Sequence, residues 1–302
     1  MNKWYIRLPL ILLGLLLTLL LLVIGIFLIL NRTNGRLVSA GEERRYLLYV
    51  PESYDPSVPT PLVITLHGLI QWPANQAAVS RWNNLADQYG FIVVYPAGMG
   101  FPMHWRTWDT PGATKDATFI SDLIDKLSTE YNIDPTRIYA NGLSNGGGMS
   151  FVLSCKLSER IAAFGSVAGA YTLPWEQCNP SRPLPAILFH GTADPIVPYQ
   201  DGHFGPTGLL FPAIPDWMGE LARRNGCDAI PQVLPASGDV SGVEYANCDG
   251  EVVFYTIAGG GHSWPGGGYL PRFIVGETTK DIDATRTMWE FFQQHQLSGV
   301  GD

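Results

Sequence analysis

Ser144 stands in a glycine-rich segment whose residue types suit nucleophilic catalysis. Gly142-Leu143-Ser144-Asn145-Gly146 is a G-x-S-x-G pattern between a short apolar run and residues that favour a helix. In a strand-turn-helix context this pattern forms a nucleophile elbow, whose sharp turn exposes the serine hydroxyl and leaves no space for side chains at the two glycines. The chain has 33 glycines, so the context rather than the pattern alone makes Ser144 a candidate nucleophile.

Two later segments supply the partners that a serine needs. A serine hydroxyl attacks well only when a base takes its proton and an acid orients that base. Asp194 follows the apolar run "AILFH" and a glycine-containing turn, and His262 follows the run "VVFYTI" and three glycines. The order Ser, Asp, His is that of α/β-hydrolases. We therefore predict that Ser144, Asp194 and His262 form a catalytic triad.

Other acids and histidines fit the triad less well. Asp201 is the nearest alternative to Asp194, but it lies in a Gly- and Pro-rich stretch. His67 and His190 end apolar runs and are expected to make structural hydrogen bonds. No histidine pair has H-x-H or H-x-x-x-H spacing, so the sequence predicts no metal site and a mechanism that needs no cofactor.

Two backbone N–H groups are expected to stabilise the negative charge that develops on the substrate carbonyl oxygen. One belongs to Asn145, at the start of the helix after the elbow. The other lies in the loop after "LVITLHG", where Leu69 is the first choice and Ile70 the second. Four tryptophans in predicted loops are candidates for the wall of a substrate cleft: Trp105, Trp108, Trp217 and Trp264.

The elements that must position these residues alternate along the chain. Apolar runs that predict strands begin at residues 45, 62, 91, 137, 164, 186 and 252. Helical patterns are clearest at residues 117–132 and at residues 283–295, where Asp283 is a predicted cap. Residues 198–225 break this alternation and predict an irregular insertion. The pattern predicts an α/β class protein with the α/β-hydrolase fold, in which helices flank a mostly parallel central sheet.

The N-terminus predicts a membrane anchor. Residues 8–30 are a run of 23 residues without a charged side chain, which is long enough to span a bilayer as a helix. The run exceeds the apolar core of a signal peptide, so an uncleaved signal anchor is favoured over a cleaved segment and a secreted protein. The predicted organisation is an anchor over residues 1–30, a linker over residues 31–41 and a catalytic domain over residues 42–302.

The net charge and the cysteines restrict the possible partners and the cellular compartment of the protein. The net charge is -8 at pH 7 and no basic cluster is present, which argues against nucleic-acid binding. The four cysteines allow three pairings, of which their spacing favours Cys155–Cys178 and Cys227–Cys248. Disulfides form in oxidising compartments, so the catalytic domain is expected outside the cytoplasm.

Five motifs, in order, resemble the extracellular polyhydroxybutyrate depolymerase and feruloyl esterase group of α/β-hydrolases. They are "LHGLIQ", "YNIDPTRIYANGLSNGGGMS", "HGTADPIVPY", "RRNGC" and "GGGHSWPGG". The resemblance, over residues 42–297, implies the same triad and a disulfide from the cysteine of "RRNGC" to a later cysteine. It also implies a carboxylesterase that acts on hydroxyalkanoate or hydroxycinnamoyl esters. Members often have cysteine where Leu69 stands, and a contact made by that cysteine is lost here.

Two other functions remain open from the sequence. Prolyl-oligopeptidase-like serine peptidases share the triad, although the chain shows no segment that would form their propeller domain. A surface protein without catalytic activity that binds a ligand in the same cleft is the second alternative. The intact triad favours the serine esterase over both.

Overall fold

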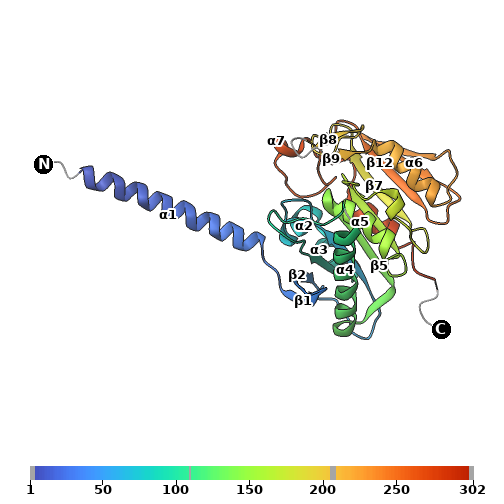
Figure 1. Ribbon diagram of the computed structural model, residues 1–302, viewed down its shortest axis with the longest axis horizontal. Coiled ribbons are helices and arrows are strands. Elements are labelled where there is room, and N and C mark those ends of the chain that lie inside the picture. The colour runs from blue at the N-terminus through green and yellow to red at the C-terminus, as the bar shows by residue number, and fades with distance from the viewer. Residues whose placement is uncertain (1–3, 109, 205–208, 299–302) are drawn as a thin grey trace.

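The computed structural model describes residues 4–108, 110–204 and 209–298 (Figure 1). A ten-stranded sheet lies at the centre of the domain, with the strand order β1-β2-β4-β3-β5-β6-β7-β12-β11-β10. The strands are β1 (Gly35–Ser39), β2 (Glu42–Tyr49), β3 (Thr60–Leu66), β4 (Ile92–Pro96), β5 (Ile133–Leu143), β6 (Ala163–Val167), β7 (Ala186–Gly191), β10 (Gln232–Ser237), β11 (Val240–Tyr245) and β12 (Val252–Ile257).

The central strands β4, β3, β5, β6, β7 and β12 are parallel, and antiparallel strands extend the sheet at both edges. The seven predicted strands are confirmed: six of them form the parallel block, and the seventh, β2, pairs antiparallel with β4 beside it. Because parallel strands end at the same edge of a sheet, the loops after β3, β5, β7 and β12 meet there. These four loops carry Leu69, Ser144, Asp194 and His262.

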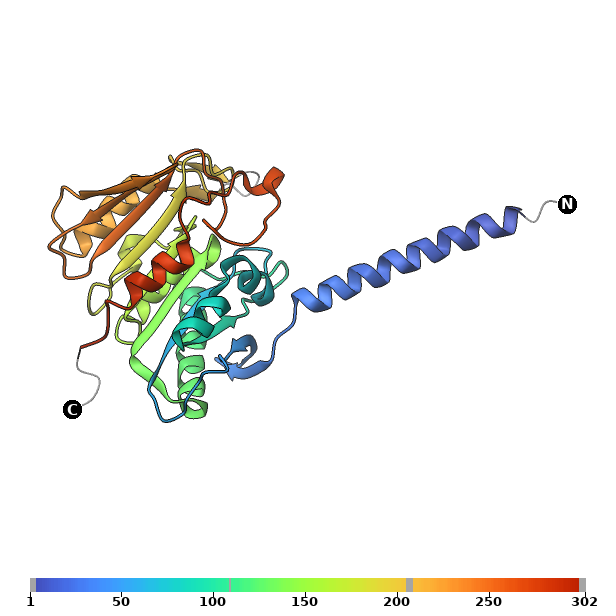
Figure 2. The same ribbon diagram turned by 180° about the vertical axis from the view of Figure 1, so that it is seen from behind.

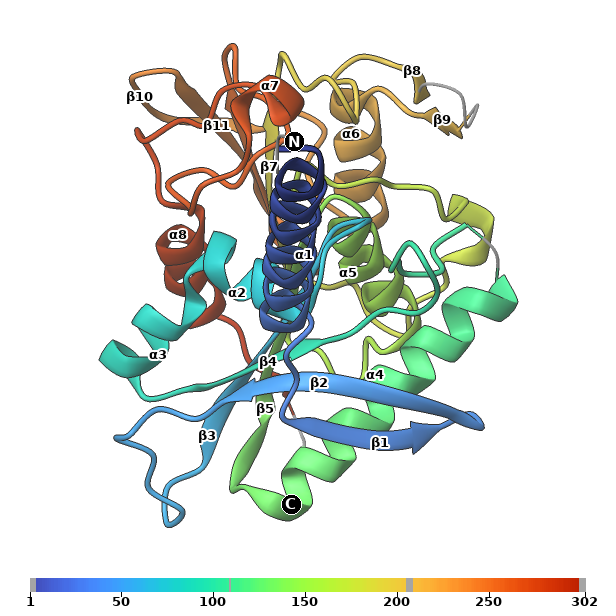
Figure 3. The same cartoon turned by 90° about the vertical axis from the view of Figure 1, so that its left-hand side faces the viewer.

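Helices cover both faces of the sheet, as Figure 3 shows. Buried side chains of α4 (Thr110–Glu130), α5 (Asn145–Lys156) and α6 (Ile214–Arg224) pack on one face. Those of α2 (Pro73–Ser80), α3 (Trp82–Tyr89) and α8 (Ala284–Phe292) pack on the other face. The Asp283 side chain accepts hydrogen bonds from the N–H groups of Thr285 and Arg286, so the predicted cap of the last helix is confirmed. The remaining short helices are η1 (Trp175–Gln177) and α7 (Arg272–Val275).

Two predictions about irregular segments are wrong. The predicted linker over residues 31–41 contains β1, which pairs antiparallel with β2 at the edge of the sheet. The predicted insertion over residues 198–225 contains the β8 (Gly202–Phe204) and β9 (Leu209–Phe211) hairpin and helix α6. Glycines in both segments, and prolines in the second, accompany short elements, which gain their stability from pairing or packing with distant residues.

Helix α1 (Trp4–Leu30) extends away from the domain (Figures 1 and 2). Its described apolar side chains are exposed, from Ile24 at 44% to Leu16 at 64%. Within the described part of the chain, no helix meets the length and hydropathy of a membrane span. In the predicted span, the side chains of residues 8, 9, 26–28 and 30 lie outside the described ones.

Both predicted disulfides are present. Cys155 at the end of α5 is bonded to Cys178, and Cys227 after α6 is bonded to Cys248. Each bond closes a loop of moderate length, with sequence separations of 23 and 21 residues. Such a loop closure stabilises a fold by about 3 kcal/mol in the chain-entropy model. The two bonds therefore tie the loop after β6 to α5, and the loop between β11 and β12 to the end of α6.

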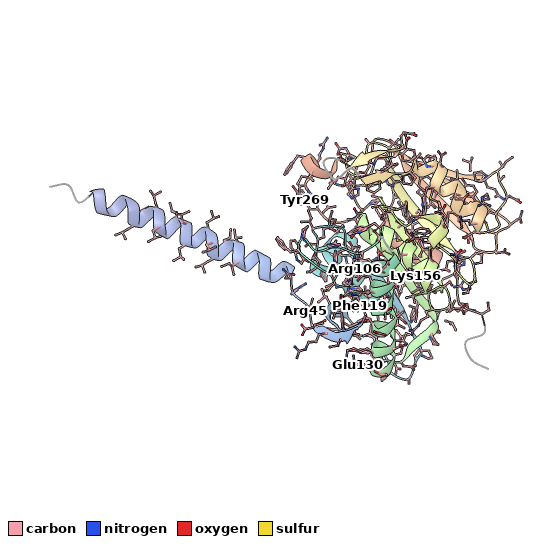
Figure 4. All side chains as sticks on the ribbon, viewed as in Figure 1. Arg45, Arg106, Phe119, Glu130, Lys156 and Tyr269 are labelled. Carbon is pink, nitrogen blue, oxygen red and sulfur yellow. A yellow bond between two sulfur atoms is a disulfide. The ribbon has the colours of Figure 1, made fainter. Side chains whose placement is uncertain are left out.

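A buried ion cluster holds the segment after β4 against the sheet. The Arg44 guanidinium lies 2.8 Å from Asp116 Oδ1, and both side chains are almost fully buried. Arg106 Nη2 lies 2.6 Å from the same oxygen, while the Arg106 N–H donates to Asp116 Oδ2. Arg44 also donates to the carbonyl oxygen of Ala97, and its guanidinium stacks on the ring of Phe119. These contacts fix both ends of a loop that reaches the Ser144 turn (Arg106 and Phe119 are labelled in Figure 4).

Candidate active site

Ser144 occupies the sharp turn that its sequence predicts. It lies between β5 and α5 with φ 58° and ψ -120°, a backbone conformation that few residues other than glycine adopt. A Cβ on Gly142 would overlap the backbone of Gly146, and a Cβ on Gly146 would overlap the carbonyl oxygen of Leu66. Both glycines are therefore required for the turn. Such strain is typical of a nucleophile held at the edge of a sheet.

Gly147 and Gly148, which the sequence pattern leaves unexplained, also have a steric role. A Cβ on Gly147 would overlap Ser166 Oγ, and a Cβ on Gly148 would overlap the carbonyl oxygen of Ala170. The first turns of α5 thus lie directly against β6 and the loop after it. The Ala170 N–H donates to the carbonyl oxygen of Ser144, so this close approach also ties the loop to the nucleophile.

We expect Gly148→Ala to destabilise the protein by about 1–3 kcal/mol, because a rigid carbonyl group blocks the new methyl group. Gly219→Ala is the matched control. Gly219 lies within α6 and has open space around it, so alanine there is expected to stabilise the helix by up to about 1 kcal/mol. Urea unfolding of both variants measures the two effects. Equal stabilities would contradict the close packing of α5 against the loop after β6.

Asp194 and His262 form a buried pair. His262 Nδ1 lies 2.7 Å from Asp194 Oδ2, and Asp194 Oδ1 accepts hydrogen bonds of 2.8 Å from the N–H groups of Ile196 and Val197. The carboxylate is thereby held in one orientation and holds the imidazole in turn. Of the described hydrogen bonds, none joins Ser144 to His262, although both residues line one cavity. Such contacts often tighten only when substrate binds.

The surroundings of Asp194 keep its carboxylate ionised. Burial raises the pKa of this carboxyl group, but the charge and the hydrogen bond of His262, with help from His190 and the Ile196 N–H, hold the pKa below its usual value. Burial lowers the pKa of His190, whose Nε2 lies 2.9 Å from the carbonyl oxygen of Val197. His190 is therefore a structural residue, as predicted. Asp201, the alternative acid, is exposed.

The geometry around Ser144 favours Leu69 over Ile70 as the oxyanion donor. The Ile70 N–H donates to the carbonyl oxygen of Met103, whereas no acceptor for the Leu69 N–H lies among the described residues. A Cβ on the preceding residue, Gly68, would lie 3.4 Å from Ser144 Cβ, so this loop contacts the nucleophile. The Asn145 N–H begins a helix and has no acceptor within it. The roles of Leu69 and Asn145 remain predictions.

The Asn145 side chain has a further structural role that the sequence did not indicate. Its Oδ1 accepts a hydrogen bond of 2.6 Å from the Trp105 N–H, and its Nδ2 donates to the Trp105 carbonyl oxygen at 3.1 Å. The indole of Trp105 donates to the carbonyl oxygen of His67. Asn145 therefore joins the elbow to the loop that the ion cluster of Arg44, Asp116 and Arg106 positions.

His67 is buried directly beneath the Leu69 loop. The Gly98 N–H donates to His67 Nε2 at 2.9 Å, so this nitrogen is unprotonated and Nδ1, 2.8 Å from the Gly68 carbonyl oxygen, carries the hydrogen. Burial lowers the pKa of His67 to about 4. The prediction of a structural hydrogen-bonding histidine is confirmed, and protonation of His67 would break its bond to Gly98.

The lowered pKa of His67 predicts a loss of stability in acid. Between pH about 6.5 and pH about 4 the unfolded chain binds a proton that the folded protein does not, so the stability falls as the pH falls. The expected loss from this group is about 3 kcal/mol across that range. Urea unfolding at several pH values measures it. His67→Gln, which cannot titrate, should show a shallower dependence, and parallel curves for the two proteins would contradict this assignment.

A cavity of about 470 Å³ opens at Ser144 and His262. Its wall is mainly apolar and, among the described residues, contains no Asp, Glu, Lys or Arg. The wall includes Leu69, Trp108, Ala170, Ile196, Val197, Phe211, Leu270 and Ile274. A cavity with such a wall suits an uncharged, apolar group beside the scissile bond.

Of the four tryptophans predicted for the cleft, only Trp108 lines the cavity. Trp105 and Trp264 are buried, and the indole of Trp264 donates to Thr285 Oγ1. Trp217 lies in α6 rather than in a loop and stacks on Tyr171 at a ring-centroid distance of 3.6 Å. The expectation is wrong for the other three candidates: Trp105 and Trp264 are loop tryptophans whose N–H groups find acceptors inside the protein, and Trp217 packs from a helix.

The cavity residues that the sequence reasoning missed are mostly aliphatic. Ile196 and Val197 directly follow Asp194 and Pro195, whereas Leu270 and Ile274 follow His262 by several residues. Their positions shortly after the predicted acid and base could have indicated that they line the cavity, because both loops lie at the same edge of the sheet. Phe211 gave no such signal, because β9 was not predicted.

A mostly parallel sheet with Ser, Asp and His on the loops at one edge defines the α/β-hydrolase class. Residues 44–173 match the family model described as esterase PHB depolymerase. These matches show that the chain is similar to the polyhydroxybutyrate depolymerase and feruloyl esterase group of α/β-hydrolases. They support a carboxylic ester hydrolase.

Three relatives illustrate the similarity. The bifunctional acetylxylan esterase/xylanase XynS20E of Neocallimastix patriciarum is 38% identical over 53% of this chain, but only 23% of its own length is covered. Feruloyl esterase C of Emericella nidulans is 28% identical over 86% of this chain and 87% of its own. The structure of an acetyl xylan esterase from Aspergillus awamori has a TM-score of 0.61 at 16% identity, and covers 86% of this chain and 98% of that one. The last similarity concerns the fold alone.

Proposed function

We propose that this protein is a serine carboxylesterase. The Ser144 hydroxyl attacks the ester carbonyl carbon while His262 takes its proton, and His262 then delivers that proton to the leaving alcohol. Asp194 holds His262 in the tautomer that accepts from serine. The backbone N–H groups of Leu69 and Asn145 bind the oxyanion. Water then hydrolyses the acyl-enzyme by the same route, and no cofactor takes part.

The observation that carries this proposal is the buried Asp194–His262 pair, whose His262 lines one apolar cavity together with Ser144. Burying a carboxylate together with an imidazole adds little to the stability of a fold. Such a pair is therefore better explained by a function than by stability. Their position at the carboxyl edge of the sheet, next to a strained serine, fits acyl transfer.

Hydroxyalkanoate and hydroxycinnamoyl esters are the proposed substrates. Both present an uncharged carbonyl group, which the apolar cavity accepts without burying a charge. A panel of feruloyl, acetyl and 3-hydroxybutyrate esters, with a dipeptide as comparison, tests the proposal. We expect hydrolysis of at least one ester. Cleavage of the dipeptide alone would favour a peptidase instead.

We further propose that residues 8–30 anchor the protein in a membrane with the catalytic domain on the oxidising side. The uncharged run and its exposed leucines support the anchor, and the two disulfides support the location. Alkaline extraction of membranes from expressing cells tests it, and release of the intact chain would contradict it. N-terminal sequencing shows whether the segment is cleaved.

A further inference from the structure

Exposed apolar side chains surround the mouth of the active-site cavity. Outside α1, most of the large apolar side chains that are exposed in the described chain belong to this region. We call this set the apolar rim. Its members are Leu69, Ile70, Phe101, Trp108, Leu210, Tyr269, Phe273 and Ile274.

The rim is contiguous with the cavity. Leu69, Ile70, Trp108 and Ile274 line the cavity itself. Phe101 precedes Met103, whose carbonyl oxygen accepts the Ile70 N–H.

The remaining members lie beside cavity residues. Leu210 and Trp108 line one neighbouring hollow. Tyr269 and Phe273 flank the cavity residues Leu270 and Pro271 along the chain. The rim therefore lies beside the entrance to the cavity that contains Ser144.

The exposure of the rim is too large and too clustered for ordinary surface residues. Phe101, Phe273 and Tyr269 are 94%, 89% and 84% exposed. Single exposed apolar residues are common on soluble proteins, but a clustered patch marks a surface that meets an apolar partner.

The position of the rim relative to α1 indicates the partner. Helix α7, which carries Phe273, and Tyr269 lie on the side of the domain from which α1 extends (Figures 1, 3 and 4). The described side chains of α1 are themselves apolar and exposed. Contact with the apolar interior of one bilayer removes both the rim and the side chains of α1 from water. Aromatic side chains such as Tyr269 also suit the boundary between lipid and water.

We propose that the apolar rim binds the surface of a phospholipid bilayer and that the cavity takes lipophilic, uncharged esters directly from the lipid. This proposal rests on the esterase activity and on the anchoring proposed above. The chemical step is unchanged, since only the route of the substrate differs. Water-soluble esters enter from the aqueous side and do not need the rim.

The test compares two double variants of the full-length protein. The rim variant carries Tyr269→Asp and Phe273→Asp, at positions that do not line the cavity. The control carries Ile230→Asp and Val233→Asp, which are 84% and 82% exposed and lie at the β10 edge of the sheet. Both variants gain the same charge. The substrates are 4-nitrophenyl butyrate in buffer and 4-nitrophenyl palmitate dissolved in phosphatidylcholine vesicles.

We expect the rim variant to hydrolyse the soluble butyrate within about twofold of the parent. Hydrolysis of the palmitate in vesicles should fall about tenfold or more, since each large apolar side chain is worth that much in transfer from water. The control should retain both activities. An equal loss in rim and control variants, or no loss in either, would overturn the proposal.

Hydrogen exchange of the parent protein, measured with and without vesicles, distinguishes a failure of the rim proposal from a failure of the esterase or anchor proposals. Because the rim is proposed to bind the bilayer, we expect added vesicles to slow exchange in residues 268–276 and to leave exchange in residues 230–235 unchanged. Unchanged exchange in residues 268–276 overturns it, whether or not the protein hydrolyses esters. Exchange in residues 8–30 reports on the anchor alone, and butyrate hydrolysis by the parent reports on the esterase activity alone.

Discussion

Ser144→Ala is expected to lower kcat for ester hydrolysis by about 10⁵-fold or more while the protein stays folded. The hydroxyl group is the proposed attacking group, and no other group stands in its position on the turn. Loss of the nucleophile in a triad removes nearly all of the rate that the triad supplies, because its members act as a unit. Alanine keeps the Cβ that the turn already accommodates, so the strained backbone at φ 58° is unchanged.

Two measurements check this result. The first is the rate with an aryl ester for Ser144→Ala beside Ser154→Ala, whose hydroxyl donates to the Phe151 carbonyl oxygen within α5. The control variant should keep its activity. The second is labelling by a fluorophosphonate probe, which should modify Ser144 in the parent and be absent from the alanine variant. Full activity in a folded Ser144→Ala variant would rule out the serine mechanism.

Asp194→Asn is expected to lower kcat by about 10⁴-fold with little change in KM. Asp194 Oδ1 accepts from the N–H groups of Ile196 and Val197, so an asparagine would place its carbonyl oxygen there. Its NH₂ group would then face His262 Nδ1 and donate to it. The imidazole hydrogen would move to Nε2, and this nitrogen could no longer take the proton of Ser144.

The structure supplies the control for this variant. Asp201 is exposed, so Asp201→Asn should leave kcat within about twofold of the parent value. Steady-state kinetics with a soluble ester separate kcat from KM for both variants. Near-parent activity in Asp194→Asn, or a large loss in Asp201→Asn, would move the role of the acid away from Asp194.

The predictions from sequence succeeded where local sterics or chain order decide the structure. The elbow glycines follow from the backbone of one turn, and the same sequence segment contains the strand, the turn and the helix. The disulfide pairs follow from spacing, since cysteines separated by 23 and 21 residues can meet through short loops beside one helix each. The positions of Asp194 and His262 follow from strands that end at a common edge.

The predictions failed where burial or pairing with a distant segment decides. Gly35–Ser39 is a strand because β2 pairs with it, which its short sequence does not reveal. Trp105 is buried because the Asn145 side chain holds its backbone and His67 accepts its indole hydrogen bond. These contacts join residues that are far apart in the sequence.

The sequence by itself therefore determined the residues of the candidate site and their order, since a turn that only glycine permits and the ends of successive strands can be recognised locally. The tertiary structure decided how those residues are used. The Ile70 N–H donates to the Met103 carbonyl oxygen, so the N–H of Leu69 rather than that of Ile70 is the proposed oxyanion donor. The apolar rim likewise forms only where residues from four parts of the chain come together. The exposure of its side chains depends on that tertiary arrangement and cannot be read from any one segment.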